Sequence, residues 1–141
     1  MPPPVTSSNK SGSGRRRSGG VDGKLSIVTA IIGCALVGSG LYGILRPAAM
    51  ARAFGVVDVT PNMAVFYPGV GGRNLSAGLA VWAFKLAGER RALGLLLLCW
   101  MCTGLADTYL LLIHWAEVDT FWLHVFNTCV LAVVAPSLIW G

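Results

Sequence analysis

The chain of 141 residues contains 55% hydrophobic and only 12% charged side chains, and its mean hydropathy is +0.67. An ordinary soluble domain carries about 25% charged residues, and a soluble chain of this length could not bury several apolar runs of about 20 residues each. The net charge of +5 does not describe a basic surface, because five of the eleven Lys and Arg residues fall within the first 24 positions. The composition excludes an ordinary soluble domain and predicts one membrane domain.

The first segment, residues 1–24, is rich in Pro, Ser and Gly and has no apolar periodicity. Such a segment cannot bury enough surface to offset the entropy lost on ordering, so we expect a disordered basic tail on the cytoplasmic side. Its arginine run, Arg15 to Arg17, is interpreted as a topology determinant that faces anionic lipid. Nucleic acid is not expected as a partner, because the tail has neither aromatic residues nor a binding motif.

Four apolar runs follow the tail, and each is long enough to cross the hydrocarbon layer as a helix. They cover residues 25–45, 64–84, 93–113 and 120–139. An open sheet would leave backbone groups unpaired in lipid, and these runs lack the two-residue alternation of barrel strands. The sequence therefore predicts an all-α fold, a polytopic four-transmembrane-helix bundle formed by residues 25–141.

The distribution of basic residues sets the expected orientation. Eight Lys and Arg residues lie in the tail and in the second connection, two lie in the first connection, and none lies in the third. By the positive-inside rule, both termini of this multi-pass protein should be cytoplasmic. The organelle is not indicated by any signal in the sequence.

The first connection places Pro47 where a helix can begin and Gly55 where one can end. This pattern predicts a short interfacial helix whose Met50 and Phe54 rest on the bilayer surface, although a plain loop fits the sequence nearly as well. Within the first two spans, small residues recur four apart and could form ridges for close helix packing. These residues are Ala35, Ser39 and Gly43 in the first span, and Gly72, Ser76 and Ala80 in the second.

Polar residues in three different spans lie at similar expected depths. Measured from the outer ends of the spans at about 1.5 Å per residue, Arg73 lies roughly 13 Å deep and Asp107 roughly 9 Å deep. In the fourth span His124 and Asn127 lie roughly 6 and 10 Å deep. Helical phase places Asp107 on one face with Thr103 and His114, and His124 on one face with Asn127 and Thr128.

An unpaired charge at the bilayer centre costs about 2.5 to 3.5 kcal/mol on insertion scales. Asp107 is the one carboxylate within the expected spans, so we predict a buried ion pair between Arg73 and Asp107. Asn127, Tyr109 or His124 should satisfy the remaining donors and acceptors. Asn74 follows Arg73 but is turned by about 100° from it.

Two functions are compatible with this cluster. In the first, the protein binds or acts on a lipophilic small molecule in a dry pocket, in an isomerisation, cyclisation or dehydration. Arg73 would stabilise an oxyanion, Asp107 would orient or charge a neighbour, and His124 would transfer a proton. Further ligand contacts are expected from Asn74, Tyr109, His114 and Asn127. In the second, the protein is a non-catalytic scaffold or an assembly or transport accessory, and the ion pair only orders the helices.

Other chemistries lack their sequence signals. There is no phosphate-binding loop, nucleophile elbow, H-E-x-x-H motif or dinucleotide fingerprint, so no cofactor is predicted. A metal site made of Asp107, His114 and His124 would have suitable ligands but no short ligand spacing, so no metal is predicted. The C-x-x-C pair Cys99 and Cys102 lacks a cationic neighbour, which favours packing over redox chemistry. Expected partners are the lipid bilayer and a lipophilic substrate, with a second copy or pathway enzymes left open.

Several segments resemble, in order, the recurrent segments of a known family. They include "GVGGRNLSAGLAVWAF", "ADTYLLL" and "FWLHVFNT", and together they extend over about residues 37–135. The family consists of small four-span integral membrane proteins of uncharacterised activity, domain of unknown function 4267. The resemblance implies that Asp107 and His124 match family residues, whereas Asn74 stands where the family usually has aspartate. Some fungal members lie among natural-product biosynthetic genes, which implies secondary metabolite biosynthesis as a setting.

Overall fold

The computed structural model describes residues 19–56, 58–113 and 118–141, and of these the side chains from residue 23 onward. The described chain is all-α. Its helices are α1 (Gly19–Leu45), α2 (Pro47–Ala53), α3 (Pro61–Ala64), α4 (Tyr67–Leu86), α5 (Arg90–Ile113) and α6 (Val118–Trp140). The four long helices, α1, α4, α5 and α6, overlap the four apolar runs found in the sequence.

Helix boundaries differ from the expected ones mainly at two places. α1 begins at Gly19 rather than at residue 25, so residues 19–24 of the expected disordered tail are helical, while residues 1–18 lie outside the described part. α4 begins at Tyr67 rather than at residue 64, because Pro68 occupies its first turn and the preceding residues form the separate helix α3.

The predicted short helix in the first connection is present as α2. Pro47 occupies its first turn, and Gly55 ends it with a φ of 98°, a conformation that glycine adopts without steric cost. The amide of Gly55 donates to the carbonyl of Arg52 at 2.9 Å, and the amide of Val56 donates to that of Ala51 at 3.1 Å. These two bonds form a Schellman motif and satisfy the carbonyls of the last turn.

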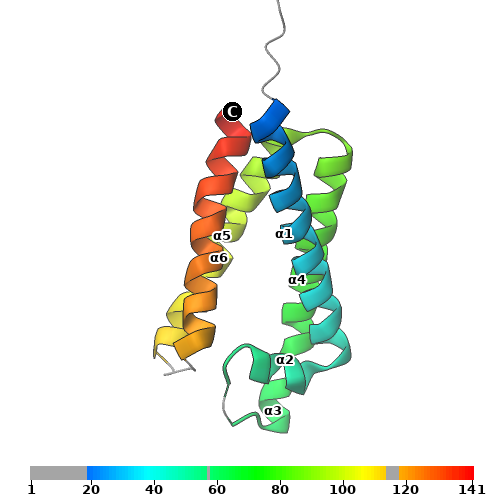
Figure 1. Cartoon of the computed structure of the whole chain (residues 1–141). Coiled ribbons are helices and arrows are strands. Elements are labelled where there is room, and N and C mark those ends of the chain that lie inside the picture. Colours follow the sequence, from blue (N-terminus) through cyan, green and yellow to red (C-terminus); the bar gives the residue numbers. More distant parts are fainter. Residues whose placement is uncertain (1–18, 57, 114–117) are drawn as a thin grey trace, which may run out of the picture.

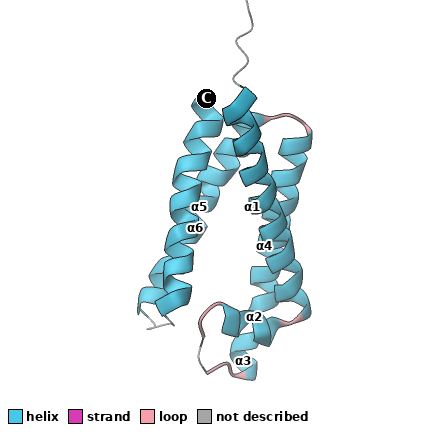
Figure 2. Cartoon of the chain, viewed as in Figure 1, coloured by secondary structure: helices cyan, strands magenta, loops and turns pink. Residues whose placement is uncertain are grey.

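The four long helices form two antiparallel hairpins, α1 with α4 and α5 with α6 (Figure 1). The start of α1, the turn between α4 and α5 and the C-terminus lie at one end of the molecule, which we call the terminal end (Figure 2). Helices α2 and α3 lie at the opposite end, which we call the α2 end. The chain thus crosses the long axis four times and finishes on the side where the described part begins.

The hairpins are joined by an apolar core at the terminal end. Side chains of α4, α5 and α6 form its buried part, and Leu25, Val28 and Ile32 of α1 pack against it. The buried members are Val81, Leu93, Leu97, Leu131, Val134, Ala135 and Leu138. Toward the α2 end the hairpins diverge (Figure 1).

Within the first hairpin, α1 and α4 approach closely through glycines. A Cβ atom on Gly71 would lie 2.7 Å from the carbonyl oxygen of Gly40, and one on Gly40 would lie 2.5 Å from the amide nitrogen of Leu75. The ridge predicted on the first span is supported at Gly43, where a Cβ would lie 3.0 Å from the Cα of Gly71. The ridge predicted on the second span is wrong in phase: a Cβ on Gly72 would meet nothing within 4 Å, and Ser76 is exposed. The close contact uses the neighbouring face of α4.

The outer surface of the long helices is apolar. Large exposed side chains include Ile31 on α1, Leu79 on α4, Leu95 on α5 and Val133 on α6. Within the described residues, three helical stretches are long and apolar enough to cross a membrane: Gly23–Leu45, Arg90–Ile113 and Val118–Trp140. This is the architecture of an integral, multi-pass membrane protein. α4 is less apolar, because it contains Arg73 and Asn74.

Candidate ligand cavity

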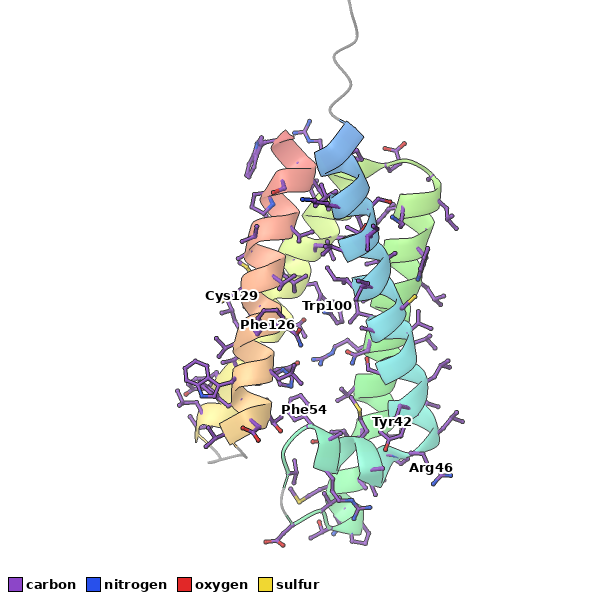
Figure 3. All side chains as sticks on the ribbon, viewed as in Figure 1. Tyr42, Arg46, Phe54, Trp100, Phe126 and Cys129 are labelled. Atoms are coloured by element: carbon purple, nitrogen blue, oxygen red, sulfur yellow. The ribbon has the colours of Figure 1, made fainter. Side chains whose placement is uncertain are left out.

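A cavity of about 450 Å³ lies between the two hairpins, on the side of the core that faces the α2 end. Pockets for small-molecule ligands typically enclose about 300 to 1,000 Å³. Residues of α1, α2, α4, α5 and α6 line it, among them Ile32, Ser39, Tyr42, Met50, Phe54, Arg73, Asn74, Trp100, Thr103, Asp107, Leu123, His124, Asn127 and Leu131. Figure 3 shows Trp100 between the hairpins and Phe54 at the α2 end of this space.

The predicted ion pair between Arg73 and Asp107 is present, but it is not buried as expected, because Arg73 is exposed. Nη2 of Arg73 donates to Oδ2 of Asp107 at 3.3 Å, and the two side chains are 39% and 14% exposed. Within the described part of the chain, this is the one hydrogen bond made by the guanidinium, so several of its N–H groups are unused. The guanidinium carbon also lies 5.7 Å from the centre of the Trp100 ring, within cation–π range.

The three ionisable residues lie at one depth in the structure. Arg73 lies six residues after the start of α4, Asp107 six residues before the end of α5, and His124 six residues after the start of α6. At about 1.5 Å per residue, each is about 9 Å from the α2 end of its own helix. The three depths agree more closely than those expected from the sequence, because α4 begins later and α6 begins earlier than expected.

His124 is half-buried and lines the cavity without a hydrogen bond from its imidazole to any described residue. The edge-to-face contact with Phe54, with ring centres 4.9 Å apart and an angle of 71°, fixes one side of the ring. The imidazole is also near enough to interact electrostatically with Asp107 and Arg73. Its nitrogens are therefore available to a molecule in the cavity.

Asn74 and Asn127 both line the cavity, but among the described residues only Asn74 has a hydrogen-bond partner for its side chain. Nδ2 of Asn74 donates to Oγ of Ser39 at 3.2 Å, which connects α4 to α1. Asn127 is exposed and makes no side-chain hydrogen bond within the described residues. The expectation that Asn127 or His124 would complete the hydrogen bonding of the ion pair is not met, since neither bonds to Arg73 or Asp107.

Of the expected ligand residues, Tyr109 is described by the structure but does not line the cavity. Tyr109 follows Asp107 by two positions, or about 200° around the helix, so it points from the opposite face of α5 and is 62% exposed. The expectation that Tyr109 contacts the ion pair is therefore wrong. His114 lies outside the described residues, and among those described no group of three or more His, Cys, Asp or Glu side chains forms a metal-binding cluster.

The C-x-x-C pair is placed away from the cavity. Cys99 and Cys102 are free thiols on the exposed surface of α5. The packing role expected for them is not realised in the core, because both residues are exposed. They are not part of the candidate site.

Trp100 and Phe54 are cavity residues that the sequence analysis did not identify. Trp100 precedes Asp107 by seven residues, which is two helical turns, so the polar stripe of α5 could have revealed it. Phe54, together with Met50, was expected on the bilayer surface, and this expectation is wrong. Since α2 folds against the hairpins and buries Ala51 completely, its apolar residues line the cavity, while Arg52 stays exposed.

The fold and the cavity define a class of protein: a multi-pass helical membrane protein with a polar site between two helical hairpins. The chain belongs to the DUF4267 family, a domain of unknown function whose pattern matches residues 33–138. The match includes Arg73, Asp107 and His124 and leaves the basic N-terminal segment outside. Comparison with curated proteins and with solved structures found no significant match.

Proposed function

We propose that the cavity binds a lipophilic small molecule with an oxygen-bearing group and performs a non-redox acid/base step on it. The observation that carries this proposal is the meeting of a guanidinium, a carboxylate and an imidazole at one depth in a cavity whose surface is mostly apolar. Pockets with apolar walls and a few convergent polar groups are typical of small-molecule sites. Ionisable residues inside the membrane are costly and usually functional.

Each ionisable residue has a role that follows from its contacts. Arg73 keeps unused N–H groups that can hold an oxygen on which negative charge develops. Asp107 holds the guanidinium in place, rather than orienting His124. His124, whose imidazole has no hydrogen-bond partner among the described residues, is the proton-transfer group.

These roles are sufficient for an isomerisation. His124 accepts a proton from the carbon next to a carbonyl, and the electron pair of the broken C–H bond moves toward the oxygen held by Arg73. The imidazolium then returns the proton to a different carbon, and the carbonyl forms again with a shifted double bond. No oxidant, reductant or second substrate is consumed. Cyclisation or dehydration would use the same groups.

We further propose that α4 crosses the membrane with the other long helices and that both termini are cytoplasmic. A helix of 20 residues is about 30 Å long, which matches the hydrocarbon thickness. Of its two charged residues, Lys85 lies in the last turn and Arg73 lines the cavity. Lys24, Lys85 and Arg91 lie at the terminal end, as the positive-inside rule requires of a cytoplasmic side.

The proposed function is tested by deleting the gene and profiling lipophilic metabolites. We expect one precursor to accumulate and to disappear when the wild-type chain is restored. Arg73→Ala and His124→Asn, at equal abundance in the membrane, should leave the precursor in place. Arg52→Ala is the matched control, because Arg52 is exposed on α2 and does not line the cavity. Full metabolite flux through the Arg73→Ala and His124→Asn variants contradicts the proposal.

A second function, that of a membrane scaffold, is favoured by one observation. The Arg73–Asp107 contact connects the two hairpins in the region where they diverge. The exchanged pair, Arg73→Asp with Asp107→Arg, separates the two functions. A scaffold needs only the attraction between the two charges. The single variants should then lose a partner complex and the exchanged pair should regain it, while the metabolites stay unchanged in all variants. A catalytic site needs the guanidinium at its own position and should remain inactive.

A further inference from the structure

We propose that the cavity is loaded sideways from the bilayer, through a portal between α1 and α6, and that its ligand is a lipophile with a small carbonyl-containing head group. This inference rests on the proposed function, since it assumes that the cavity holds a ligand. It adds the route of entry and the chemical class of that ligand. Phospholipids are excluded as the ligand by the same geometry.

The lining residues of the cavity differ in exposure between its two sides. On the side of α1 and α6, the lining residues Tyr42 and Leu123 are 44% and 56% exposed, and Ala35 and Asn127 are exposed as well. On the side of α4 and α5, the lining residues Trp100 and Thr103 are at least partly buried. Arg73 on this side is 39% exposed, but its pairing with Asp107 spans the gap between α4 and α5. The open side is therefore the one between α1 and α6, which separate toward the α2 end (Figure 1).

The α2 end of the cavity is covered. Met50, Ala53 and Phe54 line the cavity from this side. The Phe54 ring contacts both His124, with centres 4.9 Å apart, and Tyr67, with centres 6.2 Å apart, so it bridges α6 and α4. Because these rings narrow the route from water, the opening toward lipid is the wider one.

The depth of the polar group restricts the ligand. Arg73 lies about 9 Å from the end of its helix, within the hydrocarbon layer rather than at the level of lipid head groups. A phosphate head group belongs in the interfacial layer, whereas a ketone, ester or carboxylic acid carbonyl can lie at this depth. Toward the core the lining is apolar, with Ile32, Leu36 and Leu131, and it fits one chain or ring system.

Trp100 provides a probe of occupancy, because bromine atoms quench tryptophan fluorescence on contact. In a nanodisc, a variant with Trp82, Trp115, Trp122 and Trp140 replaced by Phe retains Trp100 as its one tryptophan. We expect dibrominated stearic acid and its methyl ester to quench Trp100 with saturation at low mole fraction. Phosphatidylcholine with the same dibrominated chains should quench weakly and without saturation.

The portal is tested by the rate of quenching after mixing with donor vesicles. We expect Ala35→Phe, at the rim on α1, to slow association by about tenfold, within the range over which association rates vary among related variants. Leu123→Phe, on the opposite rim, should act in the same direction and serves if Ala35→Phe does not fold. Ala132→Phe is the matched control, because Ala132 is exposed on α6 but does not line the cavity.

The outcomes separate the two proposals. If no brominated probe quenches Trp100 with saturation, the cavity does not bind a lipophile, and the proposed function and this inference both fail. If brominated phosphatidylcholine saturates as well as the acid and ester do, the ligand class is wrong while the binding function stands. If both rim variants load at the wild-type rate and Phe54→Ala accelerates loading, entry is at the α2 end and the portal is wrong.

Discussion

Arg73 reaches from α4 to Asp107 on α5, and the contact lies on the side of the core that faces the α2 end, next to Trp100, which packs against the core. Its partner could be predicted because Asp107 is the one carboxylate in the expected spans. The remaining contacts of the guanidinium could not, because the face-on approach of Trp100 depends on the angle between the hairpins. The residue types thus predicted the Arg73–Asp107 pair. Which N–H groups of the guanidinium stay without a partner depends on how the two hairpins pack.

We predict that removing one partner of the ion pair lowers the free energy of unfolding, whereas replacing both partners by apolar residues changes it little. Asp107→Asn removes the anionic partner of Arg73 and should lower the free energy of unfolding by about 1 to 3 kcal/mol. The double variant Arg73→Met with Asp107→Leu should recover most of that loss, since it removes both desolvation costs. The measurement is thermal unfolding in detergent, with Arg52→Met as the control. A double variant less stable than Asp107→Asn contradicts the prediction.

Helix pairing within the first hairpin depends on glycines that the sequence pattern alone could not single out. Small residues occur on more than one face of α4, so the four-residue spacing at Gly72, Ser76 and Ala80 predicted the wrong ridge. The contact uses Gly71 and Gly78, whose Cβ atoms would lie 2.7 Å from atoms of α1. Periodicity identifies candidate ridges, but it does not decide which of them the partner helix meets.

This contact gives a matched pair of glycine substitutions. Gly71→Ala should lower the free energy of unfolding by about 1 to 3 kcal/mol, because its methyl group would overlap the backbone of Gly40 and Ile44. Gly72→Ala meets no atom within 4 Å and should be neutral or slightly stabilising, since alanine has the higher helix propensity. Thermal unfolding of the two variants in the same detergent is the measurement, and equal melting temperatures would count against the packing described.

The same hairpin is held at the terminal end by Lys85. Its Nζ donates to the carbonyl oxygen and Oγ of Ser26 at 2.6 and 2.7 Å and to Oγ1 of Thr29 at 3.3 Å. We predict that Lys85→Met lowers the free energy of unfolding by about 1 to 3 kcal/mol, because these acceptors lose a charged donor. Lys24→Met, at an exposed lysine of α1, is the control and should change little in the same unfolding assay.

The whole molecule is two hairpins joined at one end, and the sequence predicted its helices better than its shape. Hydropathy identified the apolar runs, and charge gave an orientation that stays a prediction. The position of α2 was not predictable, because its apolar residues suit a lipid surface and a protein surface equally well. Phe54 illustrates this: it contacts His124, which follows it by seventy positions in the chain.

The proposed orientation predicts which loops can be labelled from each side. After replacement of the native cysteines by serine, Glu89→Cys in the turn between α4 and α5 should react with an impermeant maleimide only in inside-out vesicles. Asp58→Cys, between α2 and α3, should react only in right-side-out vesicles. Asp58 and Glu89 are both exposed, so a difference in labelling between the two positions reflects the side of the membrane and not burial in the protein. Labelling of both positions from one side contradicts the four-span topology.

The core at the terminal end can act as a hinge between the two long helical hairpins. A helix of about 20 residues extends about 30 Å, so a tilt of only a few degrees at the core shifts its opposite end by a few ångströms. Toward that end, the contacts Arg73–Asp107 and Phe54–His124 connect the hairpins and would have to change with the tilt. Membrane thickness acts on helix tilt at a modest cost per ångström of mismatch. The distance between the two hairpins at the portal should therefore depend on the thickness of the surrounding bilayer. A change in bilayer thickness would change how easily a molecule enters the cavity.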